Sequence, residues 1–107
     1  MAKPVRYRVT IFIDQSCEQD WYQWMAEEHI PDVMETGYFS SYTIAKITQQ
    51  SDEALRTDAS GYTIEYTAPS QEAYNSYQEH CAPALQKDHT DRFEGRFTAF
   101  RDVLEAI

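Results

Sequence analysis

Residues 5–13 read VRYRVTIFI, and this stretch decides the fold of the chain. An apolar side chain stands at every odd position, and the even positions carry Arg6, Arg8, Thr10 and Phe12. A period of two, rich in β-branched and aromatic residues, predicts a β-strand. Because both faces of this strand carry bulky side chains, we expect it to lie at the centre of its sheet.

The same patterns predict three further strands and two helical segments. We expect strands over residues 38–48, 61–67 and 96–104, and helices over residues 17–35 and 70–94. Pro31 and Pro83 lie inside the two helices, so we expect each helix to kink or restart there. Gly37 is a predicted left-handed end of the first helix. The polar residues 49–60 are predicted to form an exposed loop.

This order of elements, β-α-β-β-α-β, predicts an α+β fold of the ferredoxin-like type in a single domain over residues 1–107. Such a fold has a four-stranded antiparallel sheet with two helices on one face. The odd row of residues 5–13 should meet the helices. Arg8 and Glu65 should lie on the other face, on two central strands, where they could pair. That face is either half solvated or turned toward a second subunit around a polar cleft.

Composition limits the function classes. The net charge of −9 disfavours nucleic acid and anionic membrane surfaces as partners. No apolar run approaches the roughly 20 residues that span a membrane. Cys17 and Cys81 fall on apolar helical stripes and are predicted to be reduced core thiols. We see no signal peptide pattern, so we expect a cytoplasmic protein.

Two neighbouring residues are candidates for catalysis. Glu28 falls within the apolar arc of Trp21 and Trp24, where an unpaired carboxylate is costly to bury. It either reaches solvent because Pro31 disturbs the helix, or acts as an acid or base with a raised pKa. His29 projects toward Met25 and is either a hydrogen-bonded structural histidine or a group that transfers protons.

Other residues are candidates for ligand binding. His80 borders the apolar stripe of the second helix, and Arg92 falls near its middle or pairs with Glu28 or Asp88. The candidate ligand-binding residues are Arg8, Trp24, Glu65, His80 and Arg92. The spacing of His80 and His89 does not fit a helical metal pair, so we predict no metal. With three glycines and no glycine-rich motif, we predict no cofactor.

Two stretches carry a resemblance to a known family. One runs from Trp21 to Phe39 and includes Glu28-His29-Ile30-Pro31, and the other runs from His80 to Arg101 and includes His80-Cys81-Ala82-Pro83. The chain resembles the short bacterial proteins grouped as domain of unknown function 4286. The resemblance implies a ferredoxin-like domain and no established activity.

A shorter likeness, the His-x-Pro run followed by Gly and an aromatic residue, is similar to the dimeric α/β-barrel proteins. These include antibiotic-biosynthesis monooxygenases and EthD-like proteins. It implies a homodimer in which two sheets pack into a barrel and small organic ligands bind between sheet and helices.

Three hypotheses about function follow. The first is a non-catalytic homodimer that binds a small organic molecule. The second is a cofactor-independent, monooxygenase-like enzyme in which Glu28 or His29 moves protons and an apolar pocket touches one of them. The third is a regulatory or protein-interaction module with an exposed apolar patch and no pocket.

Overall fold

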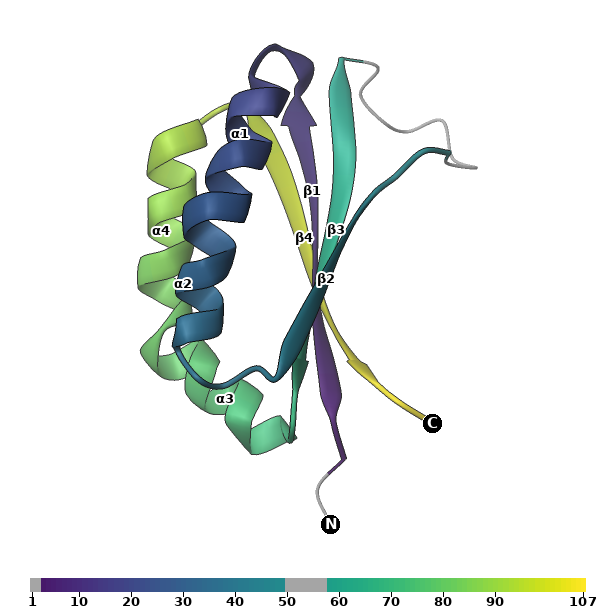
Figure 1. Ribbon diagram of the computed structural model, residues 1–107, viewed down its shortest axis with the longest axis vertical. Helices are drawn as coiled ribbons and strands as arrows, with labels where there is room; N and C mark the ends of the chain where they lie inside the picture. The colour runs from purple at the N-terminus through teal and green to yellow at the C-terminus, as the bar shows by residue number, and fades with distance from the viewer. Residues whose placement is uncertain (1–2, 50–57) are drawn as a thin grey trace.

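The computed structural model describes residues 3–49 and 58–107. Its helices all lie on one side of a twisted sheet, and both chain ends lie at the same end of the sheet (Figure 1). Most of the predicted loop, residues 50–57, is outside the described residues. In chain order the elements are β1 (Val5–Asp14), the 3-10 turn η1 (Gln15–Cys17), α1 (Glu18–Trp24), the π turn η2 (Met25–His29), α2 (Ile30–Glu35), β2 (Ser41–Lys46), β3 (Ala59–Ala68), α3 (Gln71–His80), α4 (Ala82–Phe93) and β4 (Phe97–Glu105).

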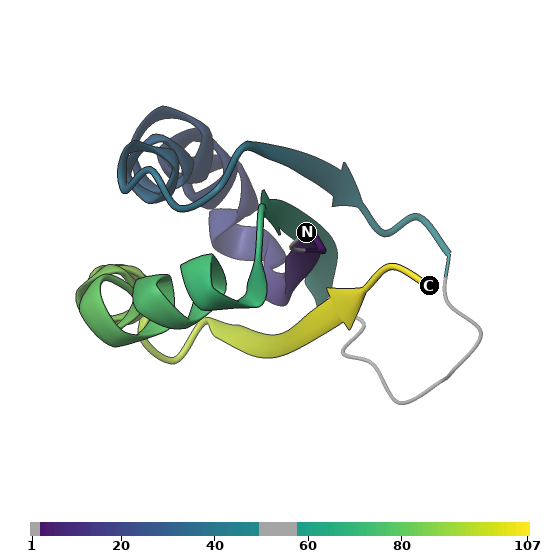
Figure 2. The same ribbon diagram turned by 90° about the horizontal axis from the view of Figure 1, so that it is seen from below.

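The sheet has the strand order β2-β3-β1-β4, and every pairing is antiparallel. The prediction of a ferredoxin-like α+β fold is confirmed, with β1 and β3 as the central pair. Figure 2 shows the two helical segments side by side over one face of the sheet. In the β1–β3 register Tyr7 faces Tyr66 and Val9 faces Ile64, so the apolar rows of both strands share the helix side.

The core lies between this apolar row and the helices. Ile13 and Trp21 are fully buried, and Ile64 and Phe93 are 1% exposed. Cys17 is buried and Cys81 is half-buried, and both thiols are free. No helix in the described part of the chain is long and apolar enough to cross a membrane.

The first helical segment changes its geometry next to Pro31, where a kink or a restart was predicted. It widens into the π turn of residues 25–29 just before the proline, and regular α-helix resumes as α2 at Ile30. The Ile30 N–H donates to the Met25 carbonyl, five residues back. A proline ring collides with the carbonyl four residues earlier and has no N–H to donate. The wider turn absorbs that conflict without interrupting the helix.

The second helical segment follows its prediction. The Ser70 hydroxyl accepts from the Ala73 N–H at 3.1 Å and caps α3. The helix breaks at Cys81, two residues before Pro83, and continues as α4. Gly37, with φ of 82°, closes the first segment in the left-handed conformation expected of it.

One carboxylate ties the start of α1 to the sheet. Glu18 accepts hydrogen bonds from Tyr62 (2.6 Å), Ser60 (2.7 Å) and Lys46 (2.9 Å). The Tyr62 hydroxyl, with Lys46 and Ser60, lowers the pKa of Glu18 to about 2. The first helix is therefore anchored by an ionised group at every ordinary pH.

Position 61 on β3 has no room for a side chain larger than that of glycine. A methyl group at this position would lie 2.7 Å from Cε1 of Phe12 and 2.9 Å from Cδ1 of Ile47. Because the Phe12 ring is itself buried, we expect Gly61→Ala to lower the free energy of unfolding by about 1–2 kcal/mol. Urea unfolding followed by circular dichroism measures this change.

Two further variants test the cause of the Gly61 effect. Thr63→Ala, on the same strand and face, should change stability by less than about 0.5 kcal/mol. Phe12→Leu in the Gly61→Ala background should recover part of the loss. An alanine variant as stable as the wild type would contradict the contact.

Candidate functional site

A small cavity lies between the sheet and the helices, and we call it the inner cavity. Its volume is about 30 Å³. The polar lining consists of Tyr7, His29, Gln86, His89 and Arg101, and the rest consists of Val9, Ile11, Met25, Val33, Ile64, Tyr66, Tyr77 and Leu85. An apolar space with a few convergent polar groups is the usual form of a small-molecule site.

The π turn places His29 at this cavity. His29 is its last residue, and the widened backbone brings the imidazole to the same space as Met25. The ring is half-buried and stacks on Trp24, with centroids 5.1 Å apart. Burial lowers the pKa of His29, and the nearby carboxylates of Asp32 and Asp88 oppose that shift. His29 thus faces the cavity as an uncharged ring at neutral pH.

The second imidazole, His89 on α4, is buried and holds a fixed hydrogen bond. Trp21 Nε1 donates to His89 Nε2 at 2.9 Å. Because Nε2 accepts, the proton of the neutral ring is on Nδ1. Burial, with His29 and Arg101 nearby, lowers the pKa of His89 to about 4. The two imidazole centroids are 5.8 Å apart.

The sheet contributes a phenol and a guanidinium. Tyr7 on β1 is 3% exposed, and burial raises the pKa of its hydroxyl, while the neighbouring Arg101 and Gln86 lower it. Arg101 lies opposite Val9 in the β1–β4 register, so its side chain projects to the helix side. The cavity therefore joins one cation to hydrogen-bonding groups from both layers.

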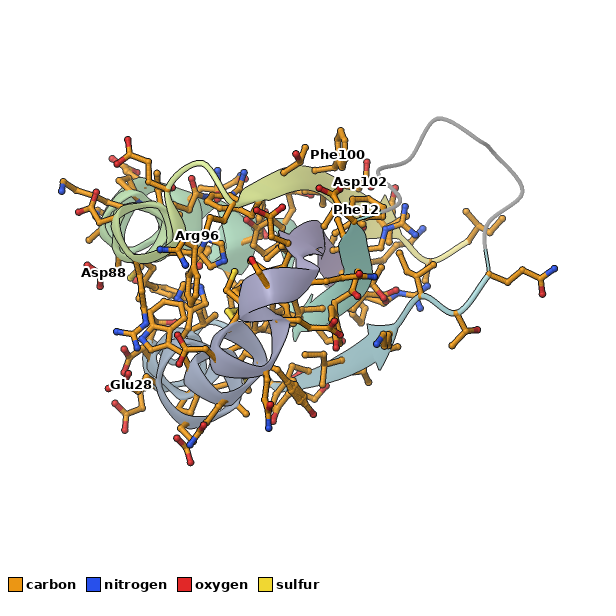
Figure 3. All side chains as sticks on the ribbon, turned by 90° about the horizontal axis from the view of Figure 1, so that it is seen from above. Phe12, Glu28, Asp88, Arg96, Phe100 and Asp102 are labelled. Carbon is orange, nitrogen blue, oxygen red and sulfur yellow. The ribbon has the colours of Figure 1, made fainter. Side chains whose placement is uncertain are left out.

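Three of the predicted residues meet in a different place. Trp24, Glu28 and Arg92 line a wide groove of about 500 Å³ over the helices, which we call the outer groove. Glu28 is exposed there, as the solvent-reaching alternative predicted, and Figure 3 shows it at the helix side of the molecule. The Arg92 guanidinium lies over the Trp24 ring, 5.5 Å from its centroid. Glu28 does not line the inner cavity.

Arg8 and Glu65 lie on the sheet face away from the helices, which we call the outer face. They are opposite each other in the register, as predicted, but they do not pair. Arg8 binds Asp102 at 3.0 Å, and Glu65 is 3.8 Å from Arg6. The neighbouring strand β4 offers Arg8 a carboxylate in better reach than Glu65. Figure 3 shows Asp102 on this face with Phe12 and Phe100.

His80 is separate from both places. It ends α3 as an exposed side chain, 3.9 Å from Glu79. Within residues 3–49 and 58–107, no three His, Cys, Asp or Glu side chains are placed to hold a metal ion.

The sequence reasoning missed four cavity residues: Tyr7, Gln86, His89 and Arg101. One signal was available for Arg101. It continues the alternation of Phe97 and Ala99, which marks the helix-facing row of the last strand. A charged residue in such a row indicates a functional site.

The fold and the inner cavity define a ferredoxin-like α+β domain with a mainly apolar cavity between its layers, into which a few polar groups converge. The chain belongs to the family described as Domain of unknown function (DUF4286), whose model matches residues 5–107. No functionally curated protein matches the sequence.

Several solved structures share the fold. SnoaB, a cofactor-independent oxygenase from Streptomyces nogalater, is 15% identical with a TM-score of 0.67, over 99% of this chain and 95% of that one. An EthD family protein from Bacillus halodurans is 12% identical with a TM-score of 0.65, over 95% of this chain and 99% of that one. A dimeric ferredoxin-like protein from an uncultured marine organism is 5% identical with a TM-score of 0.68, over 98% of this chain and 96% of that one.

The buried imidazole makes stability depend on pH. The pKa of His89 is near 4 when folded and near 6.5 when exposed. Between these values the unfolded chain binds more protons, so acid destabilises the folded state. When the pH falls from about 7.5 to about 5, proton uptake at His89 in the unfolded chain should lower the free energy of unfolding by about 2 kcal/mol. Urea unfolding at both pH values measures this.

His29 contributes in the same direction, so the variants separate the two rings. His89→Gln, which keeps an acceptor for Trp21, should remove most of the His89 share of the pH dependence. His80→Gln, at an exposed ring, should leave the wild-type dependence intact. Equal pH dependence in wild type and His89→Gln would refute the assignment.

Proposed function

We propose that this protein binds a small organic molecule in the inner cavity. The observation that carries the proposal is the convergence of Tyr7, His29, His89 and Arg101 on an otherwise apolar space. Polar groups are costly to bury and a core packs without them, so their gathering from both layers around one space favours a binding site. The outer groove supports binding less well, because it is open and its rim is mainly carboxylate. The existence of a cavity also favours this function over an interaction module without a pocket.

Ligand binding is tested by fluorescence-detected thermal shift against a metabolite library. We expect at least one compound to raise the melting temperature of the wild type. Val9→Phe places a larger side chain in the cavity and should abolish that shift. Val103→Phe makes the same kind of change on β4, outside the cavity lining, and should keep it.

Circular dichroism establishes that both phenylalanine variants are folded. If a compound stabilises the wild type and Val9→Phe equally, it does not bind in the inner cavity. If no compound in the library stabilises the wild type, the proposed function fails.

We further propose that two copies pack through the outer face, in the cytoplasm. The described helices leave this face bare, and Phe100, which is 54% exposed, lies beside Phe12 with ring centroids 6.2 Å apart. Arg6, Arg8, Glu65 and Asp102 give the face balanced charge, which suits a second copy. A structural neighbour described as dimeric supports the assembly, and the free thiols suit a reducing compartment.

Analytical ultracentrifugation at micromolar concentration tests the assembly. We expect a dimer for the wild type and a monomer for Phe100→Asp, since a buried unpaired carboxylate would oppose association. Tyr22→Asp changes an exposed aromatic residue on the helix side and should remain dimeric. A monomeric wild type would overturn the two-sheet arrangement.

A second candidate function is cofactor-independent oxygenation, in which His29 takes a proton from a C–H group of the bound molecule. The carbanion then adds to dioxygen from solution, and the peroxide that forms takes the proton back. The specific observation is an uncharged, half-buried imidazole lining the inner cavity. A neutral imidazole is a competent base at neutral pH. Mass spectrometry of each stabilising compound, incubated with protein in air, tests this. A compound that gains oxygen in the presence of the wild type but not of His29→Gln supports this function. Compounds that stay unchanged with the wild type refute it.

A further inference from the structure

The charge of the inner cavity is opposite to that of the chain. Arg101 is the one charged side chain among the residues that line it, and no Asp or Glu lies among them. The chain as a whole has 18 acidic and 9 basic residues. A cationic cavity in an acidic protein therefore needs an explanation of its own.

Arg101 has no carboxylate partner in the described part of the chain. Both β1 arginines have one, since Arg6 lies 3.8 Å from Glu65 and Arg8 lies 3.0 Å from Asp102. Those arginines lie on the outer face, whereas Arg101 lies opposite Val9 on the helix side. Two arginines with carboxylate partners thus lie on the outer face of the sheet, and Arg101, which has no such partner among the described residues, lies on the helix side.

The groups near Arg101 are uncharged. Tyr7 and Gln86 lie at its side, and burial raises the pKa of Tyr7, so that the hydroxyl keeps its proton. His29 and His89 have lowered pKa values and add no second positive charge at neutral pH. A guanidinium flanked by a hydroxyl and an amide offers several donors to one planar anion.

The size of the cavity limits the ligand. A volume of about 30 Å³ admits about two water-sized groups. Arg101 is exposed, while Met25 and Ile64 are buried at the apolar lining. This order, from an exposed cation to buried aliphatic side chains, matches a short chain with one acidic end.

Building on the proposed binding function, we propose that the inner cavity takes a short-chain monocarboxylate. Arg101 pairs with the carboxylate, and Tyr7 donates a hydrogen bond to it. The aliphatic end lies among Val9, Ile11 and Met25. Lysine in place of Arg101 keeps the charge but loses the planar fork of donors.

The experiment is an NMR titration of the ¹⁵N-labelled protein with sodium acetate, and with acetamide as a neutral probe of similar shape. Sodium chloride at equal ionic strength is the control for salt. We expect acetate to shift the signals of the cavity residues, and acetamide to bind at least about tenfold more weakly. Arg101→Gln should weaken acetate binding by a similar factor, and Arg101→Lys should restore part of it.

Arg6→Gln removes the same charge from the outer face and should bind acetate as the wild type does. If acetamide binds as tightly as acetate, and Arg101→Gln changes neither, the carboxylate inference is overturned and the proposed function stands. If acetate shifts only signals of the outer face, the inference is also overturned. If neither probe nor any compound of the library binds, the proposed function fails with it.

Discussion

The hydrogen bond from Trp21 to His89 is the interaction on which the rest of this structure depends. It joins two helical segments that are 68 residues apart in the chain, inside a core where neither ring nitrogen can reach bulk water. Because Nε2 of His89 is occupied as an acceptor, a second proton there would break the bond, so the ring stays neutral. The neutral ring packs edge-on to Phe97, with ring centroids 4.4 Å apart, and lines the inner cavity. One polar contact thereby sets helix packing, the charge of an imidazole and the shape of the cavity.

Strand β1 connects the two proposed roles of the protein. Its odd positions, among them Tyr7 and Val9, line the inner cavity, and its even positions, among them Arg8 and Phe12, form the outer face. A strand alternates its side chains strictly, so a shift of register by one residue would exchange the two faces. Binding and assembly therefore use the same backbone without sharing a side chain.

The fold could be predicted from the sequence because its signals are local. Alternation over residues 5–13, the cap at Ser70 and the turn at Gly37 each depend on neighbours in the chain. The candidate site could be predicted only in part, since His29 meets Arg101 through the fold. A regular helix wheel puts Glu28 in the apolar arc, and its exposure agrees with the solvent-reaching alternative, because the wheel does not include the wider π turn. Arg101 was overlooked although its row was visible, because the last strand is at the edge of the sheet, where charge is common.

The π turn before Pro31 also bears on how this family tolerates changes of length. A π turn contains one residue more than an α turn, so it is equivalent to a single-residue insertion within a helix. Deleting one residue between Met25 and His29 would let the backbone return to regular α geometry. The segments on either side would keep their relative orientation, because the five residues of the π turn cover about the same rotation and rise as four residues of an α-helix. Trp21 would then stay beside His89, so the cost of the deletion would be confined to the turn itself, where the ring of Pro31 would again meet the carbonyl four residues before it.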